Sequence, residues 1–161
     1  MKLFSNPLLL DYITVCCKLP QDERAQLEAF TGQPYDVDGA ALGNFTAPGF
    51  KFAIKETADA EPICVGGFVP QRPGVWRDFM LNTPEAFEQH WFSVTRLSRR
   101  TMDWMLGTQG HRIECIVPEP RLRARPQIED WYRVLGYNRE ALLYGYCANG
   151  ADAVIFSRVR H

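Results

Sequence analysis

Two side chains in the sequence have the types that acid–base chemistry uses. Tyr132 lies on a short expected helix, Gln127–Leu135, which Gly136 closes. Asp78 lies within an expected strand, residues 75–81. A tyrosine can donate a proton, and a carboxylate can accept one directly or through water. Each residue also has a structural alternative. A tyrosine on an amphipathic helix can simply pack against its neighbours, and an aspartate on a strand can simply be exposed to solvent.

The sequence lacks the residue patterns of several other catalytic sites. The five cysteines are an odd number, and no pair has the C-x-x-C spacing. His90 and His111 have no partner at a spacing typical of metal ligands. No Gly-x-Ser-x-Gly or Cys–His pattern of a hydrolase is present. We therefore expect no metal, and we expect reduced cysteines that serve as small core residues.

Composition and charge exclude further classes of function. The 161 residues are 46% hydrophobic and 23% charged, which predicts one globular domain over residues 1–161. The formal net charge of −1 argues against nucleic acid as a partner. No apolar run is long enough to span a bilayer, and the N-terminal residues do not resemble a secretory signal.

Two groups of residues are candidates for contacts with other proteins. Arg121, Arg123 and Arg125 form the one basic cluster of the chain. A solvated loop in a charge-balanced protein is the alternative interpretation of these arginines. Trp104, or Trp131 on the late helix, is expected to be partly exposed, which would suit a protein–protein interface.

Hydrophobic periodicity predicts alternating strands and helices. A loop is expected over residues 33–49, with one helical turn at Gly39–Leu42, and Thr83 and Pro84 should cap the longest helix. Strand–helix–strand crossovers place a parallel pair at the centre, and hairpins supply antiparallel edges. The expected fold class is α/β (α+β), with a mixed, mainly antiparallel sheet flanked by helices. The expected strands are 12–17, 50–56, 63–70, 75–81, 111–117, 141–147 and 153–159, and the expected helices are 20–32, 83–107 and 127–135.

From about residue 62 onward, the chain resembles the GCN5-related N-acetyltransferase (GNAT) family. The resemblance rests on two segments: Ile63-Cys64-Val65-Gly66-Gly67-Phe68-Val69, and Trp131-Tyr132-Arg133-Val134-Leu135-Gly136-Tyr137. It implies that acetyl-CoA would lie between two splayed parallel strands, here 75–81 and 111–117. It also implies that Tyr132 would act as a general acid toward the leaving thiolate and Asp78 as a possible base.

The segment after residue 81 departs from the family pattern. The family holds the pyrophosphate with a Q/R-x-x-G-x-G/A loop that opens the long helix, where free N–H groups meet the anion. Here the corresponding cofactor-binding residues would be Asn82, Thr83 and Glu85, Pro84 has no N–H to donate, and Glu88 adds a second carboxylate. We therefore expect negative charge at the cleft mouth and no micromolar binding of acetyl-CoA.

This departure leads to two hypotheses. The chain is similar to acetyltransferase-like virion proteins of short-tailed bacteriophages. That similarity implies a non-catalytic virion or virion-assembly component without a cofactor, located in the virion or host cytoplasm, with other virion proteins as partners. The alternative is an acetyl-CoA-dependent N-acetyltransferase with Tyr132 as the general acid.

Overall fold

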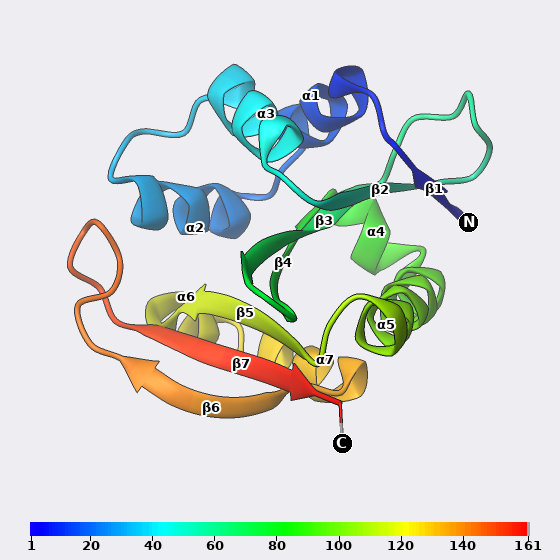
Figure 1. The fold of residues 1–161 in the computed structure, drawn as a ribbon. Coiled ribbons are helices and arrows are strands. Elements are labelled where there is room, and N and C mark those ends of the chain that lie inside the picture. The colour runs from blue at the N-terminus through cyan, green and yellow to red at the C-terminus, as the bar shows by residue number, and fades with distance from the viewer. Residues whose placement is uncertain (161) are drawn as a thin grey trace.

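The computed structural model describes residues 1–160, and its centre is one seven-stranded sheet (Figure 1). The strand order is β1-β2-β3-β4-β5-β7-β6. Every neighbouring pair is antiparallel except β4–β5, which is parallel. The expected fold class is thereby confirmed. The strands are β1 (Lys2–Ser5), β2 (Phe50–Lys55), β3 (Cys64–Arg72), β4 (Val75–Asn82), β5 (Arg112–Pro118), β6 (Asn138–Leu143) and β7 (Ala153–Val159).

Helices cover both faces of the sheet (Figure 1). One core cluster joins the sheet to α1 and α3, and a larger one joins it to α5 and α7. No helix within residues 1–160 is long and apolar enough to cross a membrane. The helices are α1 (Leu9–Cys17), α2 (Gln21–Thr31), α3 (Val37–Thr46), α4 (Pro84–Glu88), α5 (Trp91–Thr108), α6 (Glu119–Ala124) and α7 (Gln127–Leu135).

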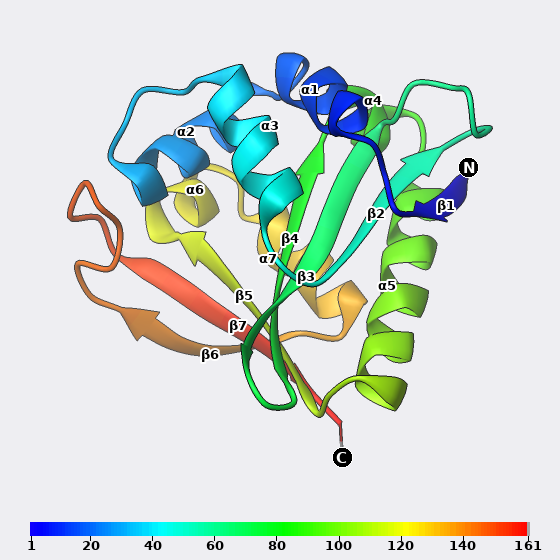
Figure 2. The ribbon, with the colours of Figure 1, turned by 45° about the horizontal axis from the view of Figure 1, so that its top comes forward.

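The parallel pair at the centre of the sheet is short. β4 and β5 pair only from Val75↔Arg112 to Arg77↔Glu114. Beyond this point β4 continues beside β3, and β5 continues beside β7. Figure 2 shows the two strands close together at one end and well apart at the other. The sheet therefore opens at its middle.

Two glycines in β3 allow its neighbours to approach closely. A Cβ at Gly66 would lie 2.8 Å from the Phe79 carbonyl oxygen, and a Cβ at Gly67 would lie 2.6 Å from the Phe50 carbonyl oxygen. Real Cβ atoms do not come this near to backbone, so only glycine fits at either position. The Gly-Gly run thus has a packing reason in this sheet.

The prediction of a strand over residues 12–17 is wrong, because this segment belongs to helix α1. Its β-branched residues favoured a strand, but the tertiary structure overrides that local preference. Tyr12, Val15, Cys16 and Leu19 follow the three-, four- and seven-residue spacing of one helix face, and all four are buried. The same pattern was therefore present in the sequence.

The predicted long helix over residues 83–107 is also wrong at its start, because the chain forms α4 and then begins α5 anew. The Thr83 hydroxyl does not cap a helix; it donates to the Ile63 carbonyl oxygen at 3.0 Å. α5 begins where the Val94 N–H donates to the His90 carbonyl. The structure also adds β1 and α6, extends the expected single turn at 39–42 into α3, and places β6 three residues earlier than expected.

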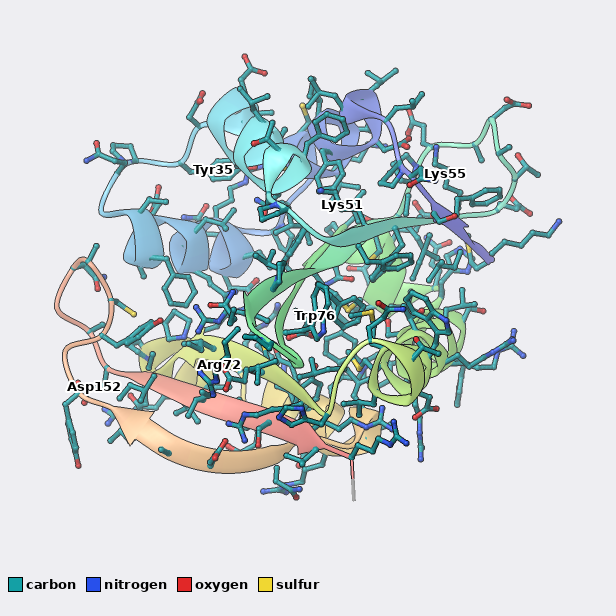
Figure 3. The ribbon with its side chains drawn as sticks, viewed as in Figure 1. Tyr35, Lys51, Lys55, Arg72, Trp76 and Asp152 are labelled. Atoms are coloured by element: carbon teal, nitrogen blue, oxygen red, sulfur yellow. The ribbon has the colours of Figure 1, made fainter. Side chains whose placement is uncertain are left out.

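A buried ion pair fastens α1 to the sheet. The ammonium of Lys55, labelled in Figure 3, contacts the Asp11 carboxylate, and both side chains are about 10% exposed or less. Asp11 also accepts a hydrogen bond from the Leu8 N–H at 2.9 Å, in the first turn of α1. Removing one charge would leave the other buried without a partner.

We expect Asp11→Ala to lower the free energy of unfolding by about 3 kcal/mol or more, because Lys55 would remain buried and unpaired. Urea denaturation monitored by circular dichroism measures this loss. Glu61→Ala is the control, because it removes the exposed Lys18–Glu61 pair and should cost less than about 1 kcal/mol. Equal losses in the two variants would contradict the assigned role of Asp11.

Candidate active site

A cavity of about 900 Å³ lies where β4 and β5 part. Three aromatic side chains near this gap could fill it: Trp76, Phe79 and Trp91. Phe79 and Trp91 instead form part of its wall. Trp76 lies at the paired end of the strands, where its indole N–H donates to the Gln109 carbonyl at 3.1 Å (Figure 3). The gap is open rather than filled by side chains.

The cavity is lined by residues from both faces of the sheet. Alternation along β4 places Met80 in the core on the α5–α7 side, and Phe79 and Leu81 in the core on the α1–α3 side. All three line the cavity, as do residues of α2 and α7. Two groups approaching from opposite faces could therefore meet between the strands. The wall residues used below are Glu23, Asp78, Asn82, Cys115, Arg121 and Tyr132.

Tyr132 projects from α7 into this gap. The Cys115 thiol of β5 donates a hydrogen bond to the Tyr132 hydroxyl oxygen at 3.2 Å, and Phe156 stacks on the Tyr132 ring at 4.9 Å. Burial raises the pKa of Tyr132 well above its ordinary value, and the nearby Cys115 and Asp78 raise it further. The hydroxyl therefore keeps its proton at neutral pH. Because Cys115 uses a lone pair of the oxygen, that proton remains available to a bound group.

Asp78 is buried. The alternative interpretation of Asp78, an exposed carboxylate on a strand, is therefore wrong. Its side chain lines the cavity on the same face as Tyr132 and close to the hydroxyl of Tyr137. Within residues 1–160 its Oδ1 atom has no hydrogen-bond partner. Burial raises the pKa of Asp78 to about 7, although Tyr137 and Cys115 partly offset this effect. Asp78 can thus exchange a proton near neutral pH.

Glu23 is a second buried carboxylate in the wall, and the sequence analysis missed it. Its Oε2 accepts a hydrogen bond from the Asn82 N–H at 3.0 Å, and its Oε1 lies 3.4 Å from Nη2 of Arg121. Burial raises the pKa of Glu23 to about 7, against the opposing effect of Arg121. In the sequence, Glu23 looked like an ordinary acidic residue in the first turn of a helix.

The basic cluster is paired within the protein. Arg121 and Arg125 both bind Asp22 on α2, at 3.0 and 2.8 Å, and Arg123 binds Glu119 at 2.5 Å. Arg121 and Arg125 also line the cavity. Arg121 and Arg125 therefore join α6 to α2 beside the gap, and neighbouring carboxylates largely neutralise their charges. Their expected contact with another protein stays a prediction.

The expected cofactor loop occupies several different environments. Asn82 lines the cavity, and Thr83 is buried with its hydroxyl bonded to Ile63. Glu85 is exposed, with Oε1 3.6 Å from Nε2 of His90. Glu85 and the equally exposed Glu88 are not wall residues of the cavity. The negative charge that we expected at the mouth thus lies outside the wall.

The two candidate tryptophans differ in exposure. Trp131 is only 7% exposed, its indole N–H donates to the Thr95 hydroxyl at 3.1 Å, and it packs against Phe87 and Trp91. This aromatic cluster covers Trp131, so Trp131 is not the exposed one of the two candidates. Trp104 is 43% exposed and packs against Phe50 with ring centroids 5.0 Å apart. Trp104 remains a candidate contact residue.

The arrangement suits transfer of a group between two molecules that meet in the gap. Asp78 and Tyr132 can accept and donate a proton there, on either side of the Cys115 thiol. Among residues 1–160, no group of three or more His, Cys, Asp or Glu side chains could hold a metal ion. Acid–base chemistry by side chains is therefore the chemistry that these residues offer.

The fold is that of the GCN5-related N-acetyltransferases. An acetyltransferase of this family from Bacillus anthracis matches with a TM-score of 0.72 at 11% identity, over 99% of this chain and 95% of that one. Spermidine N-acetyltransferase from Vibrio cholerae, solved with CoA and spermine, matches with a TM-score of 0.68 at 13% identity, over 98% and 94%. The ribosomal-protein-S18-alanine N-acetyltransferase from Escherichia coli gives 0.68 at 13%, over 98% and 92%. No family model and no curated protein match the sequence.

These matches overturn the hypothesis of a non-catalytic bacteriophage virion component. The solved structures named above are N-acetyltransferases or members of that family, and they match over nearly their whole length. The virion location and virion partners have no support and are set aside with that hypothesis. At identities this low, the similarity shows the fold alone, and the activity has to be argued from the site.

Asp78→Asn is expected to change how stability depends on pH. The folded pKa of Asp78, about 7, exceeds the value near 4 of an unfolded aspartate, so its stabilising contribution is fully present below about pH 4 and is lost as pH rises to about 7. The free energy of unfolding of the variant should equal that of the wild type at about pH 4 and exceed it by about 1 kcal/mol or more at about pH 8.

Urea titrations of both proteins across this pH range measure the difference. Glu23 has a pKa shift of the same sign but is present in both proteins, so subtraction isolates Asp78. A difference that does not vary with pH would show that Asp78 ionises normally.

Proposed function

We propose that this protein is an acetyl-CoA-dependent N-acetyltransferase. The observation that carries the proposal is the open cavity at the parting of β4 and β5, with Tyr132 and Asp78 in its wall. The fold shared with known N-acetyltransferases supports it. The spermidine N-acetyltransferase among them was solved in complex with CoA, which also favours this cofactor.

The free edge of β4 suits an extended donor chain. β4 pairs with β3 along its length, whereas β5 takes up its other edge only as far as Arg77. Backbone N–H and C=O groups beyond Arg77 can therefore bind an extended, amide-containing chain as a further strand would. The acyl-pantetheine arm of acetyl-CoA is such a chain, and it would end beside Cys115 and Tyr132.

The nucleotide end of the donor would meet a different environment. Asn82 lines the cavity, and so does Trp91 in the first turn of α5, where backbone N–H groups have no partner within the helix. Glu85 and Glu88 are exposed and outside the wall, so they need not contact a bound diphosphate. We propose that Asn82 and this helix start, rather than Thr83 or Glu85, hold that end of the cofactor.

When bound, acetyl-CoA supplies a thioester whose acyl carbon an amine can attack. Tyr132 donates its proton to the leaving sulfur. Burial raises the pKa of Tyr132, and the same apolar surroundings disfavour a charged thiolate beside it, which favours transfer of the proton to the leaving sulfur. Asp78, with its pKa of about 7, accepts the proton that the reaction releases.

The acceptor would enter from the opposite face. The wall there includes Phe30 and Tyr146, which pack edge to face, together with Leu27 and the buried carboxylate of Glu23. An amine with an apolar body fits these side chains by shape and by charge. Screening amines by release of free CoA thiol would identify the acceptor.

We expect isothermal titration calorimetry to show one acetyl-CoA site of micromolar affinity. Met80→Trp should weaken binding at least about tenfold, because the larger ring would fill the gap beside β4. Trp104→Ala is the control and should bind as the wild type does, because Trp104 lies outside this cavity. The absence of binding to the folded wild-type protein would refute the proposed function.

Tyr132→Phe should lower kcat about 100-fold, because the variant keeps the ring but loses the proton donor. Steady-state kinetics with an accepted amine measures this, and calorimetry should show unchanged acetyl-CoA affinity. Circular dichroism serves as the control for folding. An unchanged kcat would assign Tyr132 to packing against Phe156 instead.

A further inference from the structure

Cys115 is the one nucleophilic side chain placed between the two groups that move protons in the cavity. It projects from β5 on the same face as Asp78, and its thiol donates to the Tyr132 hydroxyl at 3.2 Å. The Asp78 carboxylate lies close enough to Cys115 for each to shift the other's titration. Thiol, carboxylate and phenol thus form a chain of three groups at the parting of β4 and β5.

A second observation indicates that this cluster faces a ligand. Asp78 is 7% exposed and lines the cavity, yet its Oδ1 atom has no hydrogen-bond partner within residues 1–160. A buried carboxylate oxygen without a partner is costly, so such atoms mark places where a bound group or a moving proton completes the contact. The cluster is therefore more than an isolated buried cysteine.

We propose that Cys115 takes the acyl group from the donor thioester and holds it as an acyl-cysteine until an amine removes it. This inference rests on the proposed function and deepens it. The reason is proximity: a thioester placed for Tyr132 to protonate its sulfur also lies within reach of the Cys115 sulfur, which contacts the Tyr132 hydroxyl. Direct attack by the amine would leave this thiol unused at the reacting centre.

The first half of the reaction is a thiol exchange. The Cys115 sulfur forms a bond to the acyl carbon while its proton passes to Asp78, and the bond from that carbon to the CoA sulfur breaks. The CoA sulfur takes the proton of Tyr132, and the proton held by Asp78 restores Tyr132. One thioester is exchanged for another, and one proton moves from Cys115 to CoA.

The second half returns the enzyme to its starting state. The amine nitrogen attacks the acyl carbon of acyl-Cys115 from the α1–α3 side and loses a proton to Asp78. The bond to the Cys115 sulfur then breaks, and the sulfur recovers that proton. Burial raises the pKa of Cys115 well above its ordinary value, so the thiol stays protonated until Asp78 accepts its proton.

Exchange between acetyl-CoA and isotopically labelled free CoA, without any amine, tests the proposal. An acyl-cysteine makes this exchange possible, whereas direct transfer to the amine does not. We expect the wild type to pass label into acetyl-CoA, and Cys115→Ser to lose the exchange by about 100-fold or more because a hydroxyl replaces the thiol. Cys17→Ser is the matched control and should keep full exchange, since Cys17 is exposed and outside the cavity.

Asp78→Asn keeps Cys115 and should slow the exchange about 100-fold, which provides a second variant if Cys115→Ser does not fold. Acid-quenched wild-type protein should carry one acetyl group on the peptide that contains Cys115, removable by neutral hydroxylamine as a thioester is. Amine acetylation by a wild type that shows neither exchange nor this thioester would overturn the proposal and leave the proposed function standing. Failure of acetyl-CoA to bind at all would overturn both.

Discussion

The short parallel pairing of β4 and β5 is the constraint on which the rest of the structure depends. Three residues of each strand pair, and the strands then follow different partners, β3 on one side and β7 on the other. In a parallel pair the hydrogen bonds are evenly spaced along the strands for as long as the two strands stay together. Here the free edge of β4 remains in the middle of the sheet, with a cavity beside it.

This opening explains why polar groups occur so deep in the protein. Asp78 and Glu23 each have a pKa raised to about 7 by burial, so each stays partly neutral at physiological pH. Such groups cost stability, and a fold selected for stability alone would replace them with apolar residues. Their position around one gap is the arrangement expected of a site that moves protons.

Local sequence signals predicted those elements whose ends are marked by glycine or proline. α2 ends at Gly32 and α7 at Gly136, both in the left-handed conformation, and both helices were located well. α1 was missed because β-branched residues suggested a strand, and the break before α5 was missed because Thr83 bonds across to Ile63. The site residues show the same contrast between local and tertiary signals. Tyr132 was found from a family segment, whereas Glu23 joins the site through tertiary contacts of α2 with Asn82 and Arg121.

The acidic segment after β4 shows the limit of reasoning from charge alone. Glu85 and Glu88 stand one and four residues after Pro84, where the family pattern would place a phosphate loop. We expected these carboxylates to repel the diphosphate of acetyl-CoA. That expectation required one helix from Pro84 to Gly107 whose N-terminus faces the cleft. The chain instead forms the five-residue α4, leaves both carboxylates exposed, and begins α5 at Trp91, which lines the cavity. Because the long helix starts at Trp91, about two turns after Pro84, the positive end of its dipole also lies away from these acidic residues, so they do not decide whether a nucleotide can bind.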